Sequence, residues 1–157
     1  MQKGGDDMGE ITYNDTIRLR ICEKIVDIPV TVTHKDLDVD ADILVRIEYE
    51  GKEYIGRGDC LEWTDAFADL QKQLPDGVLI SSCLTCRHGT LCPYGNIPNY
   101  VLCFRSEEIK SKDDVIDRLY GADTGRIERT AFQCCEDFEP AKKGYYTYND
   151  FLYFLEK

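Results

Sequence analysis

Residues 43–58 read ILVRIEYEGKEYIGRG, and this stretch decides the fold of the chain. Ile43, Val45 and Ile47 occupy every second position, which is the period of a strand with one buried face. Gly51 permits a tight turn after this strand, because glycine adopts a positive φ without steric cost. The stretch therefore predicts a β-hairpin.

Two segments before this hairpin show the same alternation, DTIRLRI at residues 15–21 and VDIPVTVT at residues 26–33. The apolar positions are Ile17, Leu19 and Ile21 in the first segment and Val26, Ile28, Val30 and Val32 in the second. Pro29 has no N–H to donate, which favours an edge position for the second strand. Short strands are also expected for VLIS at residues 78–81 and YVLCFR at residues 100–105.

Helices follow the strands along the chain. Trp63, Phe67, Leu70 and Leu74 form one apolar stripe at helical spacing in residues 60–74, and Asp59 with Glu62 resembles a capping box. Further helices are expected to begin at Ser111 and near Thr147. Strands first and helices later predict an α+β fold: a mainly antiparallel sheet from the N-terminal half, with two or three helices packed on it.

The length of 157 residues suits one domain, here residues 11–157, after a flexible N-terminal tail at residues 1–10. No apolar run is long enough to cross a bilayer, and no export signal is visible, so a cytoplasmic protein is expected. The net charge is −11, and residues 1–80 carry 9 Lys and Arg against 18 Asp and Glu. This charge argues against nucleic acid and makes a basic protein the candidate partner.

Eight cysteines in a reducing compartment are expected to stay free or to bind metal. Three of them lie in SSCLTCRHGTLCPYGN at residues 81–96, a cysteine-rich loop that we expect to bind metal. Cys83 and Cys86 form a C-x2-C pair, which can offer two thiolates to one ion from a tight turn. Cys22 and Cys60 are expected to be small buried residues of the core.

A tetrahedral Zn²⁺ site needs two more ligands. The cysteine cluster at 83–103 and 134–135 leaves alternatives open, Cys92 or Cys103 for the third ligand and Cys134 or Cys135 for the fourth. The preferred set is Cys83, Cys86, Cys103 and Cys135, which would join the loop to the C-terminal part of the chain. His88 is expected to be a loop histidine or, as the lesser choice, a ligand.

The alternative cofactor is an iron–sulfur cluster. The spacing C-x2-C-x5-C with Pro93 after the third cysteine resembles the start of auxiliary-cluster motifs in radical enzymes of the SPASM type, over about ten residues. The resemblance implies a redox role. PYGN at residues 93–96 lacks the next cysteine of that pattern, so Cys134 or Cys135 would have to replace it.

No nucleophile elbow, P-loop, dinucleotide fingerprint or zinc-protease motif is present in the sequence, which favours a non-catalytic protein. We therefore expect a small acidic protein with a structural zinc site that acts by binding another protein, as an immunity protein or antitoxin does. Tyr145 and Tyr146 precede the last expected helix and are candidates for an interaction surface.

Overall fold

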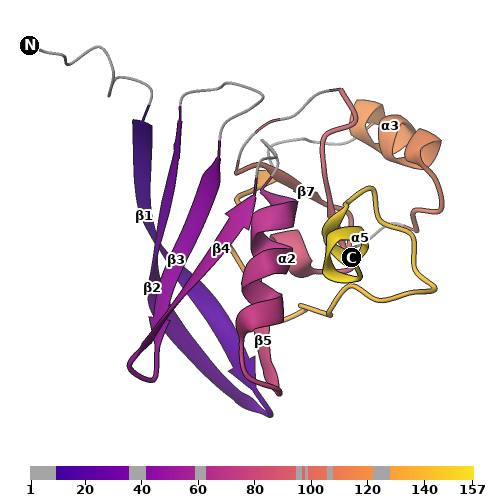
Figure 1. Cartoon of the computed structure of the whole chain (residues 1–157). Coiled ribbons are helices and arrows are strands. Elements are labelled where there is room, and N and C mark those ends of the chain that lie inside the picture. Colours follow the sequence, from indigo (N-terminus) through magenta and orange to yellow (C-terminus); the bar gives the residue numbers. More distant parts are fainter. Residues whose placement is uncertain are drawn as a thin grey trace, which may run out of the picture.

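Five antiparallel strands form a curled sheet in the N-terminal half of the chain (Figure 1). The computed structural model describes residues 10–35, 42–58, 63–94, 97, 99–105, 108–121 and 128–157. The strands are β1 (Glu10–Ile21), β2 (Lys24–Lys35), β3 (Ile43–Tyr49), β4 (Lys52–Gly58) and β5 (Val78–Ser81), in the spatial order β4-β3-β2-β1-β5. The predicted β-rich half and its strand segments are confirmed.

The predicted hairpin at residues 43–58 is formed by β3 and β4, with Tyr49 paired to Lys52. Glu50 has φ 52° and Gly51 φ 81°, so both turn residues are left-handed, as a tight hairpin turn between twisted strands requires. The edge position predicted for β2 is wrong, because β2 lies between β1 and β3. Pro29 is tolerated there because the pairing of β2 with β3 begins only at Val30.

The alternating residues of these strands face the interior of the curl. Ile17, Leu19, Val32 and Val45 are fully buried, together with residues of the predicted helical stripe. That stripe belongs to helix α2 (Thr64–Gln73), and its members Trp63, Phe67, Leu70 and Leu74 are all buried. The helix begins at Thr64, after Trp63, whereas the expected capping residues Asp59 and Glu62 lie outside the described residues.

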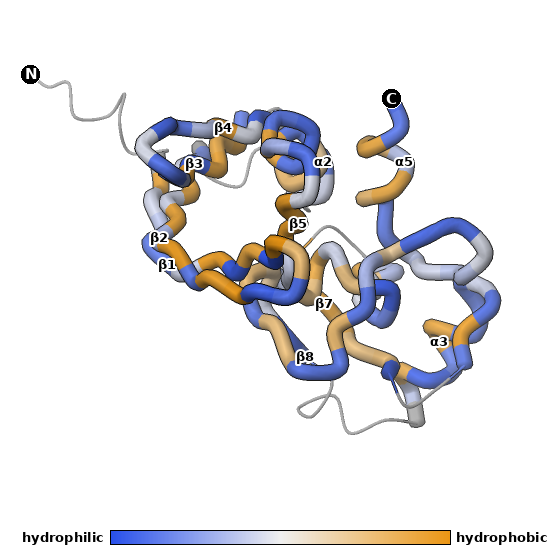
Figure 2. Tube along the Cα trace, turned by 90° about the horizontal axis from the view of Figure 1, so that it is seen from below, coloured by the Kyte–Doolittle hydropathy of each residue, from blue (hydrophilic) through white to orange (hydrophobic). Residues whose placement is uncertain are grey.

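Helix α2 packs on the edge strand β4 and is joined to the other edge strand, β5, by side-chain hydrogen bonds, which closes the curled sheet (Figure 2). The Gln71 side chain donates to Val78 O and accepts from the Ile80 N–H, both at 2.8 Å, and so bonds the edge of β5. On the other edge, Gln73 Nε2 donates to Ile55 O at 2.7 Å. The helix therefore satisfies backbone groups of both edges, which an open sheet would leave to solvent.

Close packing of α2 on β4 depends on Gly56. A Cβ atom at this position would meet the carbonyl oxygen of Ala66 and would lie 2.7 Å from Leu70 Cβ. Real Cβ atoms do not approach other atoms so closely, so only glycine allows this distance between strand and helix.

The C-terminal half contains short elements. They are the 3₁₀ turn η1 (Cys83–Thr85), strands β6 (Gly89–Thr90), β7 (Val101–Cys103) and β8 (Glu128–Arg129), and helices α3 (Lys112–Gly121) and α5 (Phe151–Leu155). The strands β6, β7 and β8 form a second antiparallel sheet in the order β6-β7-β8. Ser111 Oγ accepts from the Asp114 N–H at 3.2 Å, which confirms the predicted start of α3. The helix expected near Thr147 begins later, at Phe151, after Asp150.

Both halves contribute to one main cluster of buried residues, which extends from Ile17 to Phe151. Phe132 joins them, with its ring centroid 6.0 Å from that of Trp63 and 5.2 Å from that of Phe67. The fold is therefore a mixed α and β structure, as the sequence predicts. Residues 1–9 of the expected tail lie outside the described residues, and Glu10 already belongs to β1. Within the described parts of the chain, no helix is long and apolar enough to cross a membrane.

Candidate functional site

Backbone hydrogen bonds join the cysteine-rich loop to a segment near the C-terminus. Residues 83–87 run beside residues 133–141, and Cys86 forms an antiparallel bridge with Pro140. The bonds run from Cys83 N–H to Gln133 O (2.6 Å), from Arg87 N–H to Glu139 O (2.8 Å) and from Ala141 N–H to Thr85 O (3.0 Å). Segments about fifty residues apart in the sequence thus lie side by side.

A third segment, β7, adds Cys103 to the same place. Cys103 pairs with Gly89 across the β6–β7 ladder, and Phe104 N–H donates to His88 O at 3.2 Å. A Cβ at Gly89 would collide with the carbonyl oxygen of Cys83 and would lie 3.3 Å from that of Cys86. The absence of a side chain at residue 89 therefore lets the loop fold tightly beside β7.

The three segments bring five cysteines around one small cavity of about 10 Å³. Its thiols are those of Cys83, Cys86, Cys103, Cys134 and Cys135. His88, Gly89, Arg105 and Phe138 complete its lining. We call the five cysteines the thiol cluster.

Polar groups surround the sulfur atoms. The His88 N–H lies 3.5 Å from Cys86 Sγ, and Arg105 Nη1 lies 3.5 Å from Cys135 Sγ. Cys134 Sγ lies 3.0 Å from Ser81 Oγ. The hydrogen bond to Cys135 raises the pKa of Arg105 above its ordinary value, and the N–H donors at Cys86 stabilise negative charge on that sulfur.

Burial acts against this effect. It raises the pKa of Cys83 to about 12 and also raises the pKa of Cys86 above its ordinary value. Hydrogen bonds from the backbone of Glu139 and His88 oppose the rise at Cys86. At neutral pH Cys83 therefore carries its proton, which a thiolate-binding ion would have to displace.

The structure brings together the four preferred ligands, Cys83, Cys86, Cys103 and Cys135, in the lining of one cavity. A shared cavity is not a coordination sphere, however. Among the described residues, no three or more His, Cys, Asp or Glu side chains are arranged to hold a metal ion. The metal-binding loop expected from the sequence is therefore not supported by the side-chain positions.

The remaining cysteines lie elsewhere. Cys92 does not line this cavity. The burial predicted for Cys22 is wrong, since it is exposed at the two-residue turn between β1 and β2, where its φ is 59°. Cys60 lies outside the described residues. The seven described cysteines are all free thiols.

Two neighbours of the sulfurs, Arg105 and Ser81, are not among the site residues expected from the sequence. A signal for Arg105 existed, because it follows Cys103 by two residues and side chains two apart share a face of a strand. Ser81 ends β5 and approaches Cys134 from a distance of 53 residues along the chain, which no local pattern encodes. No protein family, curated protein or solved structure matches this chain.

Proposed function

We propose that this is a small, acidic, non-catalytic binding protein whose C-terminal half is stabilised by one Zn²⁺ ion. Cys83, Cys86, Cys103 and Cys135 are the proposed ligands. The observation that carries the proposal is the convergence of five thiols from three distant segments on one cavity. Four thiolates around one ion form a closed structural zinc site, and such a site explains why cysteines from distant segments lie together.

Small side-chain movements would have to complete the site. Each Sγ atom can swing about its Cα–Cβ bond among three staggered positions without moving the backbone. The backbone that places the cysteines is already fixed by the hydrogen bonds to residues 133–141 and by the β6–β7 pairing. Arg105, which contacts Cys135, would offset part of the negative charge of four thiolates.

The size of the cavity favours zinc over the alternative, an iron–sulfur cluster. About 10 Å³ is roughly the space of one water-sized sphere, which suits a single ion. A cluster also contains inorganic sulfides and would need a larger space between the cysteines. The iron–sulfur alternative therefore requires a larger opening of the cavity than the zinc site does.

The binding role rests on charge. A net charge of −11 in 157 residues gives a strong field that attracts and orients a basic partner. An immunity or antitoxin-like protein, which masks a basic toxin in the cytoplasm, is the form of this role that we propose. The test is association with a basic protein encoded beside it, in a complex that weakens steeply as salt rises. Association that does not depend on salt would contradict the proposal.

Metal analysis of the purified chain tests the zinc site. Expression and purification without chelators under anaerobic conditions should give a colourless protein with about one zinc per chain. Cys83→Ser should lose the metal, whereas Cys92→Ser, which alters a thiol outside the cavity, should retain it. A brown protein with iron and acid-labile sulfide would establish the alternative, and zinc retained in Cys83→Ser would show that the ligand set is wrong.

A further inference from the structure

A cleft of about 630 Å³ opens next to the thiol cluster, between the cysteine-rich loop, the end of β7 and the segment before α5. Its volume lies in the range typical of sites for small organic ligands. Residues of three separate segments line it, among them Arg87, Phe104, Arg105, Glu108, Lys110 and Tyr146. His88 and Arg105 line both this cleft and the thiol cavity.

The cleft differs in charge from the rest of the molecule. Among the described residues of its lining, Arg87, Arg105 and Lys110 are cations and Glu108 is a carboxylate. The chain as a whole carries 30 acidic against 19 basic residues. Three cations from two segments around one cleft, in so acidic a protein, favour a ligand with a negative charge.

The ion pairs in the structure leave these cations able to bind a ligand. Arg87 Nη1 lies 3.3 Å from Glu139 and Arg105 Nη1 lies 2.9 Å from Asp137. Each of these pairs involves one guanidinium nitrogen, whereas a guanidinium group carries five N–H donors. Lys110, which pairs with Glu108 at 3.0 Å, has a side chain that is 77% exposed. Exposed pairs of this kind are weak, so an incoming anion can compete for the cations.

The cleft also offers flat and apolar surfaces. Phe104 and Ile109 contribute to its lining, and the exposed rings of Tyr145 and Tyr146 stand beside the cations. The Arg87 guanidinium lies 3.7 Å from the centroid of the Tyr145 ring, which orients this cation within the cleft. A ligand that uses both parts of the lining therefore carries a compact anionic group and a flat apolar body.

We propose that this cleft is a binding site for a small organic anion, with its phosphate or carboxylate group held by Arg87, Arg105 and Lys110 and its flat body beside Phe104 and Tyr146. No proposed zinc ligand lines the cleft, and the test variants alter Lys110 and Arg87 rather than Arg105, which contacts the proposed ligand Cys135. The cleft adds a ligand site to a protein that we propose to act through a macromolecular partner.

Titration calorimetry with phenyl phosphate on the full chain tests this site, because the probe carries one anionic group and one ring. The expected result is saturable binding that weakens with salt, together with weaker binding of inorganic phosphate and no binding of the uncharged benzyl alcohol. Lys110→Gln and Arg87→Gln should each weaken the binding of phenyl phosphate by roughly fivefold or more, as the loss of a charged hydrogen bond implies.

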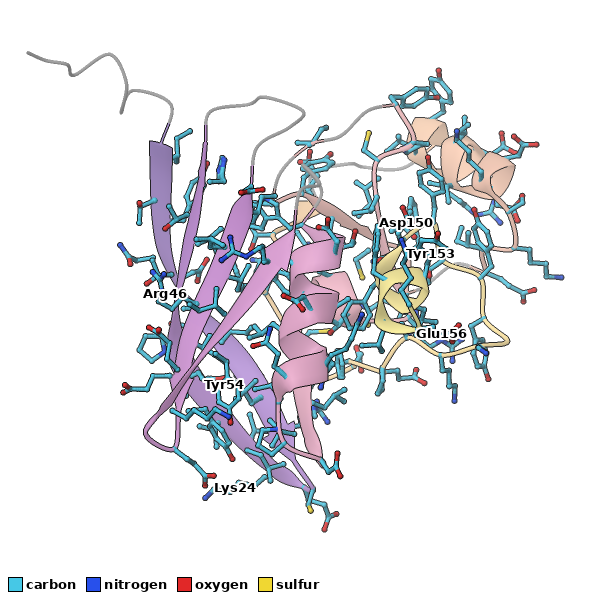
Figure 3. The ribbon with its side chains drawn as sticks, viewed as in Figure 1. Lys24, Arg46, Tyr54, Asp150, Tyr153 and Glu156 are labelled. Atoms are coloured by element: carbon cyan, nitrogen blue, oxygen red, sulfur yellow. The ribbon has the colours of Figure 1, made fainter. Side chains whose placement is uncertain are left out.

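Arg46→Gln is the matched control. Arg46 is also a partly exposed cation in an ion pair, 3.4 Å from Glu53. It lies on the sheet, on the opposite side of the view from Asp150, Tyr153 and Glu156, which lie in or next to α5 (Figure 3). Equal weakening in Arg46→Gln, binding of benzyl alcohol as tight as that of phenyl phosphate, or no saturable binding of phenyl phosphate would each overturn the proposal. Zinc content measured on the same samples keeps a failure of this site separate from a failure of the metal site.

Discussion

β1 and β2 pair along all twelve of their residues, whereas β6 and β7, in the C-terminal half, pair through two residues each. The long strands of the first region bury an alternating apolar face, and α2 closes their edges with side-chain hydrogen bonds. The second region has short elements joined by loops, and its cysteines gather where three of its segments meet. Regular secondary structure and apolar burial thus account for the first region, and the second is the one that the proposed ion would stabilise.

Removal of zinc should produce the largest difference in local stability between the two regions. Treatment with a chelator under reducing conditions should increase amide hydrogen exchange in residues 83–105 and 133–141 by at least about tenfold, because their shared anchor is lost. The strands β1 to β4 should keep their protection, and added Zn²⁺ should restore the loop. An equal increase in both regions would show that the sheet depends on the metal as much as the loop does.

Gly56→Ala should cause the largest loss of stability within the first region. The new methyl group would collide with α2, and overpacking of this kind costs about 2–3 kcal/mol of unfolding free energy. Gly51→Ala is the control in the neighbouring turn, where no atom lies within 4 Å of the added Cβ. Its positive φ alone should cost about 1 kcal/mol. Urea unfolding measures both, and equal losses would contradict the close approach of helix and strand.

Gln71→Leu should lower the unfolding free energy by about 1–2 kcal/mol. It removes the side-chain donor to Val78 O and the acceptor for the Ile80 N–H, and so leaves a backbone N–H of β5 unsatisfied. Gln73→Leu changes the same residue type on a more exposed part of the helix and should cost less. A larger loss in Gln73→Leu, measured by thermal unfolding, would argue against α2 as the element that closes the β5 edge.

The smallest expected effect is that of Asp27→Asn. Arg18 lies 2.8 Å from Asp27 and lowers the pKa of this carboxyl. The pair therefore stabilises the fold above the unfolded pKa of about 3.9, and this contribution is lost as the pH falls through the lower folded pKa. Since both side chains are partly exposed, Asp27→Asn should lower the unfolding free energy by less than about 1 kcal/mol at pH 7. Urea titrations at pH 7 and pH 2 test it, and a difference that grows toward low pH would contradict the sign.

The strands of the first region were predictable because their signal is local. A period of two at residues 15–21, 26–33 and 43–49 is sufficient to identify strands with one buried face. The position of β2 inside the sheet was not predictable, because Pro29 carries the same local signal in an edge strand and just before the segment of β2 that pairs with β3. The curl closed by α2 depends on side-chain hydrogen bonds from Gln71 to β5 and from Gln73 to β4, which the period of the strands does not encode.

The candidate site was predictable in part. The C-x2-C pair marks Cys83 and Cys86, but nothing local links them to Cys103 or Cys135. Their meeting in one cavity results from hydrogen bonds between residues about fifty positions apart. The cleft beside them, with its three cations, could not be predicted, because Arg87, Arg105 and Lys110 share no motif in the sequence.

X-ray absorption spectroscopy at the zinc edge, on the full chain purified without chelators, reports the ligands of the proposed ion. An ion held by four cysteines should show one shell of four sulfur atoms at about 2.3 Å from the metal, the distance expected for zinc thiolates. A shell of nitrogen and oxygen atoms, or a folded protein without zinc, would contradict a structural ion held by the thiol cluster.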